Sequence, residues 1–484
     1  MTKLLVTFHR WVSILLCLMF AAWFASGIVM IYVPFPALSD AERIERAEVI
    51  DISGVTSLSE PFMATGIDTA ARIRLLQYQN RPILVAEDYS NNSVAVFADS
   101  AELVPTLTAA DSQNISENFS DAPIVSVSDP IMYDQWVVHD RFDPYRPFFR
   151  VELGDKDRTH IYISAKTTEV LQKTNRHQRV WNYFGAVIHW IYPTVIRKDW
   201  ALWDQLVWWV SLFGILGVIA GMILGIKHSV AGWKRGSKGL ASPFSGWLAW
   251  HHKIGFVFGV FALLWIFSGW LSMDHGRLFS TPAPSDKQEA DVRGISLTTA
   301  LSQASHEDLT KFLDTREFEI SALAGQALLI AKNDQASELS LIGMDLIPDQ
   351  QYLIPAVQSA VSHAWPSITI KDSYMVAADD VYGHLREGSL PESTLRVVLD
   401  DVDETWVHVN LNEGRIISVM DRSRRIYRWL FNGIHSLDLP GLADKRPLWD
   451  VLMVLFMIAG FMFSITGVVI AYRKLVRLLT GALP

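Results

Sequence analysis

One stretch of this sequence occurs twice, and this repeat constrains the fold more than any other feature. Residues 179–228 recur with a shift of 246 positions, which places Arg179 on Arg425 and His189 on His435. Both copies continue into a long apolar run that ends in basic residues. A match at one fixed offset over such a length indicates that a whole structural unit is repeated.

The apolar run near the N-terminus has a partner as well. Segment 8–33 matches segment 250–275 with a shift of 242 positions, which places His9 on His251. Further matches in these segments are Trp23 with Trp265, Ser26 with Ser268 and Gly27 with Gly269. The chain is therefore interpreted as two copies of one unit, in which a polar domain lies between two apolar helices. The retained histidines are the clearest indication of function.

Four segments are long and apolar enough to cross a lipid bilayer. They cover about residues 11–33, 205–226, 254–273 and 451–472. Trp or Tyr flanks each segment, which is typical of helices anchored at the membrane surfaces. The first segment is longer than the apolar core of a cleaved signal peptide and has an internal counterpart, so we expect it to remain in the protein.

The charges predict the orientation of these helices. Residues 1–33, 227–253 and 473–484 contain Lys and Arg but no Asp or Glu, so all 51 acidic residues lie elsewhere. By the positive-inside rule, these basic segments are cytoplasmic and the large polar domains lie on the opposite side of the membrane. The acidic balance of those domains disfavours a nucleic-acid partner, whereas membrane lipid is an expected one.

The predicted fold class is a membrane α-helical protein with exterior α+β domains. Its first half is predicted to contain a membrane helix at 1–33, an exterior domain at 34–178, an interfacial helix with the second membrane helix at 179–228, and a cytoplasmic loop at 229–249. Its second half is predicted to contain a membrane helix at 250–273, an exterior domain at 274–424, an interfacial helix with the fourth membrane helix at 425–474, and a cytoplasmic tail at 475–484. Strand-like alternation at 160–164 and 406–410 closes each exterior domain.

Short motifs carry a resemblance to a known family. The endings I-Y-I-S and T-E-V-L within 161–171, and V-H-V-N and G-R-I-I within 407–417, resemble PepSY domains. The helix opening H-R-W at 9–11 and the run G-I-H-S-L-D-L-P-G-L at 433–442 resemble the PepSY-associated transmembrane (PepSY-TM) family. This family includes iron-regulated inner-membrane proteins and ferric-siderophore reductases of the FoxB type. The resemblance and the charges together imply a multi-pass protein of the bacterial inner membrane, with cytoplasmic termini and periplasmic PepSY-like domains.

Seven histidines lie at the ends of the predicted membrane helices. The cytoplasmic ends carry His9, His228, His251 and His252, and the exterior ends carry His189, His275 and His435. Histidine pairs that face the inside of a helix bundle can hold haem through an imidazole on each side of the iron. A second interpretation is that each histidine is a polar anchor at the membrane surface.

The spacing along the third helix favours two haems over one. The segment from His251 to His275 spans roughly 36 Å as a helix, which is a full bilayer crossing. The simplest assignment pairs His9 with His251 at the cytoplasmic face and His189 with His435 outside, with His252, His275 and His228 as alternates. Because the chain has a single cysteine and no Cys-x-x-Cys-His motif, the expected cofactor is non-covalent haem b.

Glycines in the predicted membrane helices allow two interpretations. They are Gly27, Gly214, Gly217, Gly221, Gly269, Gly460 and Gly467. Such positions let a flat porphyrin approach the backbone, and they equally let two helices pack closely. The sequence leaves both interpretations open.

The resemblance and the histidines imply an enzyme, a haem-dependent ferric-siderophore reductase. Electrons would enter from a cytoplasmic reductase or a quinol, because no G-x-G-x-x-G nucleotide motif follows a strand. They would cross two b haems and reduce a ferric siderophore in the periplasm, which releases ferrous iron. The alternatives are a siderophore or iron permease component and a haem-free PepSY regulatory membrane protein. Membrane helices without carboxylates at mid-depth disfavour the permease.

Overall fold

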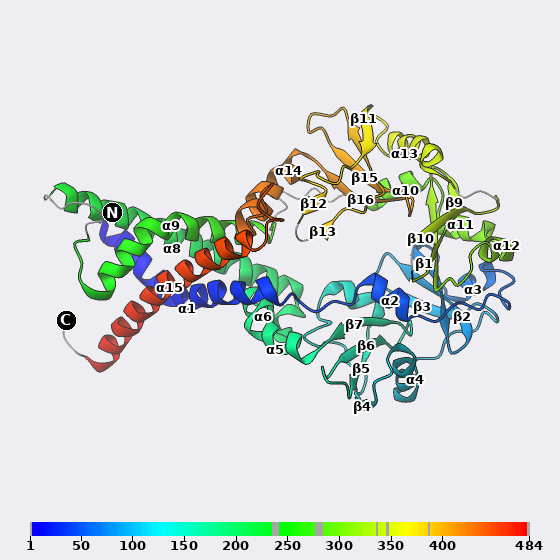
Figure 1. Ribbon diagram of the computed structural model, residues 1–484, viewed down its shortest axis with the longest axis horizontal. Helices are drawn as coiled ribbons and strands as arrows, with labels where there is room; N and C mark the ends of the chain where they lie inside the picture. The colour runs from blue at the N-terminus through cyan, green and yellow to red at the C-terminus, as the bar shows by residue number, and fades with distance from the viewer. Residues whose placement is uncertain are drawn as a thin grey trace.

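The computed structural model describes residues 2–234, 242–275, 284–334, 337–344, 348–385 and 388–481. Figure 1 shows a long bundle of helices on one side of the molecule and the β-sheets on the other. Both termini lie at the far end of the bundle, which we call its terminal end, and the sheets attach at its domain end. Parts of the loop predicted at 229–249, of the domain predicted at 274–424 and of the tail predicted at 475–484 lie outside the described residues.

The bundle consists of four long apolar helices, α1 (Thr2–Tyr32), α8 (Trp200–Lys234), α9 (Gly246–Leu271) and α15 (Leu448–Thr480). A helix satisfies every backbone polar group internally, which a segment in lipid requires. Outward-facing apolar side chains such as Leu15, Val257 and Leu455 are more than half exposed, as suits a surface that contacts lipid. The prediction of a membrane protein with four apolar helices is therefore confirmed.

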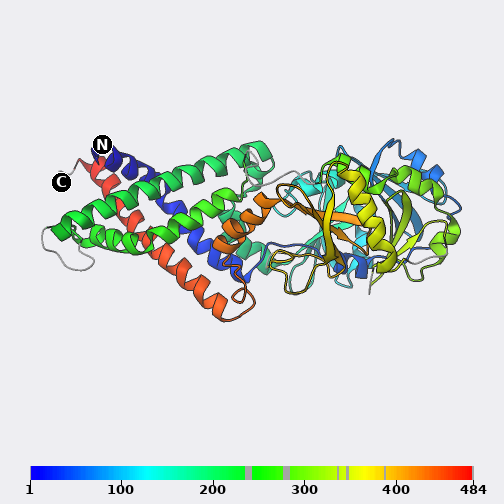
Figure 2. The same cartoon turned by 90° about the horizontal axis from the view of Figure 1, so that it is seen from above.

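The middle of the bundle is a packed apolar and aromatic core. It contains Phe24, Phe258, Ala262, Trp265, Trp449, Met453 and Met457. The ring of Phe24 meets that of Trp265 edge to face, with centroids 5.9 Å apart. A Cβ atom at Gly460 would lie 2.4 Å from the Phe24 ring, so only glycine allows this approach of α1 to α15. In Figure 2, α1 (blue) crosses α15 (red).

A six-stranded antiparallel sheet joins the two polar segments of the chain. Its strand order is β10-β9-β8-β1-β2-β3. The strands are β1 (Ala70–Tyr78), β2 (Arg81–Asp88), β3 (Ser93–Phe97), β8 (Glu317–Leu323), β9 (Gln326–Lys332) and β10 (Ser337–Leu341). Strand β1 pairs with β8, with Ile73 opposite Ile320. The segments predicted as separate domains at 34–178 and 274–424 therefore share one sheet.

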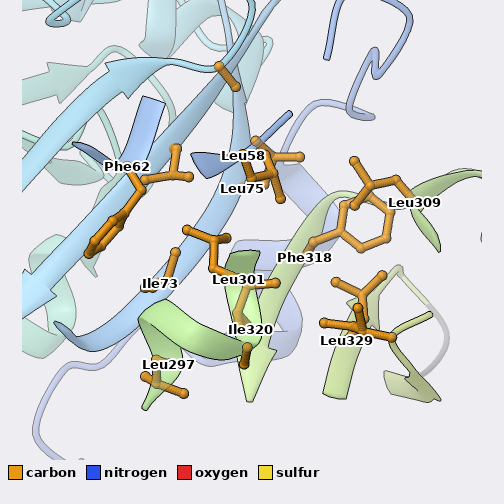
Figure 3. Close-up of a cluster of buried hydrophobic side chains, with 14 of the residues drawn as sticks. Leu58, Phe62, Ile73, Leu75, Leu297, Leu301, Leu309, Phe318, Ile320 and Leu329 are labelled. Carbon is orange, nitrogen blue, oxygen red and sulfur yellow. The ribbon is translucent and has the colours of Figure 1, made fainter. Parts of the chain in front are cut away.

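An apolar core covers one face of this shared sheet. Figure 3 shows side chains of β1, β8 and β9 pointing toward those of two short helices, α3 (Ser59–Ala64) and α11 (Leu297–Gln303). Phe62, Leu301 and Phe318 are among the buried members. Burying one such side chain contributes about 1.5–3 kcal/mol, so this core holds the two segments together.

Each segment also contributes a four-stranded antiparallel sheet of its own. The first has the order β4-β5-β6-β7, with β4 (Ile124–Val127), β5 (Phe148–Leu153), β6 (His160–Ser164) and β7 (Val170–Thr174). The second has the order β11-β14-β15-β16, with β11 (Ile370–Met375), β14 (Thr394–Leu399), β15 (Trp406–Asn410) and β16 (Arg415–Met420). Strands β6 and β15 coincide with the strands predicted at 160–164 and 406–410.

Shorter elements complete the described chain. The helices are α2 (Asp40–Arg46), α4 (Ala109–Phe119), α5 (Arg176–Phe184), α6 (Ala186–His189), α7 (Thr194–Arg197), α10 (Asp286–Arg293), α12 (His306–Thr310), α13 (Gln350–Ala364) and α14 (Arg422–Arg428). A 3-10 helix η1 (Asp140–Tyr145), a π-helical turn η2 (Trp429–Gly433) and the two-residue strands β12 (His384–Leu385) and β13 (Gly388–Ser389) make up the rest.

Buried ion pairs cross the junction between β1 and β8. Glu317 has a fully buried side chain and accepts hydrogen bonds from Arg43 at 2.7 Å and from Lys332 at 2.9 Å. Burial alone would raise the pKa of Glu317, but Arg43, Arg74 and Lys332 hold it well below its ordinary value. These pairs join side chains from both polar segments, so they reinforce the shared sheet.

Candidate functional site

Two pairs of histidines face each other inside the bundle. The ring centroids of His9 and His251 lie 6.4 Å apart near the terminal end. Those of His189 and His435 lie 6.1 Å apart at the domain end. The structure therefore brings together the same partners that the sequence repeat pairs.

At the domain end, two tryptophans hold the backbones of the paired histidines in place. His189 ends α6, and Nε1 of Trp23 on α1 donates to its carbonyl at 2.8 Å. His435 follows the π-helical turn η2, and Nε1 of Trp265 on α9 donates to its carbonyl at 2.9 Å. Each tryptophan thus ties a short helical segment from the domain end to a membrane helix.

Two serines fix which ring nitrogen carries the hydrogen. Nδ1 of His189 lies 3.1 Å from Oγ of Ser26, and Nδ1 of His435 lies 3.0 Å from Oγ of Ser268. Each serine hydroxyl donates its own hydrogen to a tryptophan carbonyl at 3.0 Å. Because that hydrogen is used, the serine oxygen accepts from Nδ1–H. Both rings therefore carry hydrogen on Nδ1 and a free lone pair on Nε2.

In the terminal-end pair, Nδ1 of each histidine is also hydrogen-bonded, but to different partners. Nδ1 of His9 lies 2.9 Å from the carbonyl oxygen of Gly217, which only accepts hydrogen bonds. Nδ1 of His251 lies 2.9 Å from Oγ1 of Thr466, whose hydroxyl donates to the Phe463 carbonyl. Both rings again carry hydrogen on Nδ1. Throughout the described ranges, no hydrogen bond to Nε2 of these four histidines is found.

A glycine of a membrane helix lies against each paired ring. A Cβ atom at Gly221 would lie 2.6 Å from Cε1 of His9, a distance that side chains do not tolerate. The corresponding distances to the nearest His Cε1 are 3.4 Å at Gly269, 3.7 Å at Gly27 and 3.8 Å at Gly467. The other predicted glycines, Gly214, Gly217 and Gly460, instead face the side chains of Phe20, Val12 and Phe24. Close packing therefore explains Gly214, Gly217 and Gly460, and the other four glycines leave room for the histidine rings.

The three alternate histidines lie outside these pairs. Nε2 of His252 is 3.1 Å from the Gly225 carbonyl, and the rings of His228 and His252 lie 6.5 Å apart. Nδ1 of His275 pairs with the buried carboxylate of Asp204 at 2.7 Å. His252 and His275 thus have a ring nitrogen engaged by a carbonyl or a carboxylate, whereas His228 and His252 lie about as far apart as His9 and His251.

The geometry of the pairs fits haem ligation. An iron held by two imidazole nitrogens at about 2 Å places the ring centroids roughly 6 Å apart. A hydrogen bond from the opposite ring nitrogen is the usual support for a metal-bound histidine. Among the described residues, no group of three or more His, Cys, Asp or Glu side chains is arranged to hold a metal ion. Each pair thus supplies two ligands, which suits an iron whose other positions are filled by porphyrin.

Some of these supporting residues could be recognised in the sequence. Trp23 and Ser26 recur as Trp265 and Ser268 at the same offset as the histidines, but the sequence analysis assigned them no role. Thr466 could not be recognised in this way, because the equivalent position in the first copy, 246 residues earlier, is Ala220. The partner of His9 is a backbone carbonyl, which no residue type reveals.

The fold and the site define a membrane protein with two facing histidine pairs in a four-helix bundle. The profile of the family described as "PepSY-associated TM region" matches residues 6–474, nearly the whole chain. The chain therefore belongs to this family, and the predicted resemblance is confirmed at that level. No curated protein matches the chain significantly.

Proposed function

We propose that this protein is a di-haem b enzyme of the bacterial inner membrane that reduces ferric siderophores in the periplasm. The observation that carries the proposal is the presence of two histidine pairs with free Nε2 lone pairs, one toward each end of the bundle. His9 and His251 would hold one haem, and His189 and His435 the other. Bound haem supplies a one-electron couple between ferric and ferrous iron at each site.

The residues between the pairs suit electron transfer. The apolar cluster that contains Phe24 and Trp265 extends from Phe463, which stacks on the His251 ring, to the backbone of His435. Trp265 itself hydrogen-bonds the His435 backbone, so the core contacts the support of the domain-end pair directly. A dry, rigid path lowers the cost of reorganising solvent when charge moves.

Charge supports the proposed orientation. The described basic residues Lys3, Lys227 and Arg473 belong to the helix ends at the terminal end of the bundle, and the positive-inside rule favours a cytoplasmic position for that end. Electrons would enter there from a cytoplasmic reductase or a quinol. One electron passed outward would reduce one ferric ion, which hard oxygen ligands of a siderophore hold much more weakly once it is ferrous. The two halves of the chain would each be one copy of a helix–domain–helix unit with a PepSY-like domain.

The alternatives are a permease component and a haem-free regulatory protein. Both would leave the Nε2 atoms of the four histidines without a ligand. The same arrangement, a hydrogen-bonded Nδ1 and an Nε2 lone pair without a protein partner among the described residues, occurs at both ends of the bundle, and a metal ligand would use all four lone pairs.

The function is tested by following ferrous iron in membrane vesicles. Right-side-out vesicles that contain the protein and a respiratory substrate should reduce an external ferric trihydroxamate, detected with a ferrous chelator. The variant His435→Ala should lose this activity because the outer haem is missing, whereas His252→Ala should keep it. Parent-like reduction by His435→Ala would contradict the proposed exit site. If the purified parent protein neither reduced the ferric complex nor contained haem, a regulatory role would be favoured.

A further inference from the structure

A pocket lies beside β5, β6 and α5 in the first four-stranded sheet. Its lining includes Asp134, Trp136, Arg150, His160, Arg179 and Tyr183. Arg150 donates to the Asp134 carboxylate at 2.9 Å, and Arg179 donates to the Thr174 carbonyl at 3.1 Å. The pocket thus combines two fixed guanidinium groups with aromatic walls.

The corresponding place in the second sheet is filled by a tryptophan side chain. Trp406 occupies the position of His160, 246 residues later in the chain. Its ring lies 4.1 Å from the guanidinium carbon of Arg396 and 4.4 Å from that of Arg425. The edge of Tyr382 completes the contact, with ring centroids 5.2 Å apart. An indole is therefore enclosed by two arginines and a tyrosine.

The first sheet keeps this enclosure but lacks the indole. Arg150, Arg179 and Trp136 stand at the positions of Arg396, Arg425 and Tyr382. The side chain of Arg150 is 42% exposed, whereas that of Arg396 is only 2% exposed. The difference follows from the smaller imidazole of His160, which leaves the space above Arg150 open.

The charges of the pocket favour an anion. Two guanidinium groups face one carboxylate, that of Asp134. Burial and the neighbouring Arg179 lower the pKa of His160 to about 4, so this ring is neutral at pH 7. The lining itself therefore carries two positive charges and one negative charge, and the Glu152 carboxylate lies 3.9 Å from His160 beside it.

We propose that this pocket is a binding site for a planar aromatic carboxylate. The aromatic ring would take the place that the Trp406 indole takes in the second sheet, stacked on Arg150 and Arg179. The carboxylate, which lies in the plane of the ring, would then be within reach of the positive charge of both guanidinium groups. The proposal rests on the pocket itself and does not depend on bound haem.

The pocket also has a packed connection to the domain-end histidines. Trp136 contacts Phe35 with ring centroids 5.6 Å apart, and Phe35 contacts Trp190 at 5.5 Å. Trp190 directly follows His189 in the chain. A ligand in the pocket would therefore lie against the aromatic cluster that supports the domain-end pair.

Equilibrium dialysis of the purified full-length protein with indole-3-carboxylate tests the proposal. The parent protein should bind about one ligand per chain, and cyclohexanecarboxylate, which has the same charge but no planar ring, should bind at least tenfold more weakly. His160→Trp should abolish binding because its indole fills the pocket. His177→Trp, which adds an indole to the exposed face of α5, should bind like the parent.

A second variant tests the proposal if the His160→Trp protein does not fold. Arg150→Lys keeps the charge but loses the planar group that stacks on the ring, so it should weaken binding at least tenfold while cyclohexanecarboxylate binding stays unchanged. Absence of binding by the parent would overturn the proposal. So would equal binding of the two carboxylates, or parent-like binding by a folded His160→Trp protein.

Discussion

The hydroxyl of Ser268 lies 3.0 Å from Nδ1 of His435 and can only accept its hydrogen bond, because it donates its own hydrogen to the Trp265 carbonyl. This relationship leaves the lone pair of His435 on Nε2, the ring nitrogen that Ser268 does not contact. Ser26 and His189 repeat the relationship at 3.1 Å. In the proposed haem protein, the two serines would hold both rings in the tautomer that metal ligation requires.

Replacing Ser268 with Ala removes the acceptor of the Nδ1 hydrogen and frees the ring of His435 to rotate or change tautomer. We expect the affinity for the domain-end haem to fall about 10- to 100-fold, as is usual for the loss of such a support. Competition with apomyoglobin measures this affinity. Ser272→Ala on the same helix removes an exposed serine bonded to the Gly269 carbonyl and should change nothing. Equal haem retention in both variants would show that Ser268 does not orient the ligand.

Replacing Gly221 with Ala should displace His9. The new methyl group would lie 2.6 Å from Cε1 of His9, so the ring must shift away from its partner. We expect the variant to retain about one haem per chain, that of the domain-end pair. Gly225→Ala, one turn further along α8, meets nothing within 4 Å and should retain both haems. Replacing glycine with alanine stabilises the helix by up to about 1 kcal/mol at either position. A loss of haem seen only in Gly221→Ala would therefore result from the contact with His9.

The buried pairs of Glu317 should make the shared sheet sensitive to acid. The folded protein holds the pKa of Glu317 well below its ordinary value of 4.5. Its contribution to stability is therefore full above that ordinary value and declines as the pH falls below it. Glu317→Gln should lower the free energy of unfolding by roughly 3–5 kcal/mol at pH 7, because the arginines around it lose their buried partner.

Thermal unfolding in detergent between pH 3 and pH 7 measures this effect. The difference between the parent and Glu317→Gln should shrink as the pH falls below about 4.5, because the Glu317 carboxylate then binds a proton in the unfolded chain but not in the folded one, which favours unfolding of the parent. Glu338→Gln removes an exposed carboxylate from β10 of the same sheet and should unfold like the parent. A constant difference at every pH would mean that the charge of Glu317 is not what stabilises the sheet.

Much of the bundle was predictable from local pattern. Long apolar runs have few structural options in lipid, so the four helices followed from composition. The pairing of His9 with His251 and of His189 with His435 followed from the repeat, because equivalent positions tend to occupy equivalent places. The pairing of β1 with β8 did not follow, since strands far apart in the chain carry no local signal of their partner or register.

The supporting contacts of the site were harder to predict for a related reason. Ser26 and Ser268 stood in the matched segments, but a serine in an apolar helix has many uses, including bonds to its own helix backbone. The carbonyl of Gly217 carries no sequence signature at all. The sequence shows His160 at the position that Trp406 has in the second copy. Only the structure shows that two arginines flank each of these side chains, and the proposed pocket depends on those arginines.

The most direct measurement of the central claim is the haem content of the purified protein and its single-histidine variants. Protein from haem-sufficient cells should show a b-type spectrum with about two extractable haems per chain. His9→Ala and His251→Ala should each lose the terminal-end haem, and His189→Ala and His435→Ala the domain-end haem, which leaves about one haem in every case. His252→Ala should keep both. A colourless parent protein, or one whose haem content no substitution at these four histidines changes, would contradict the account.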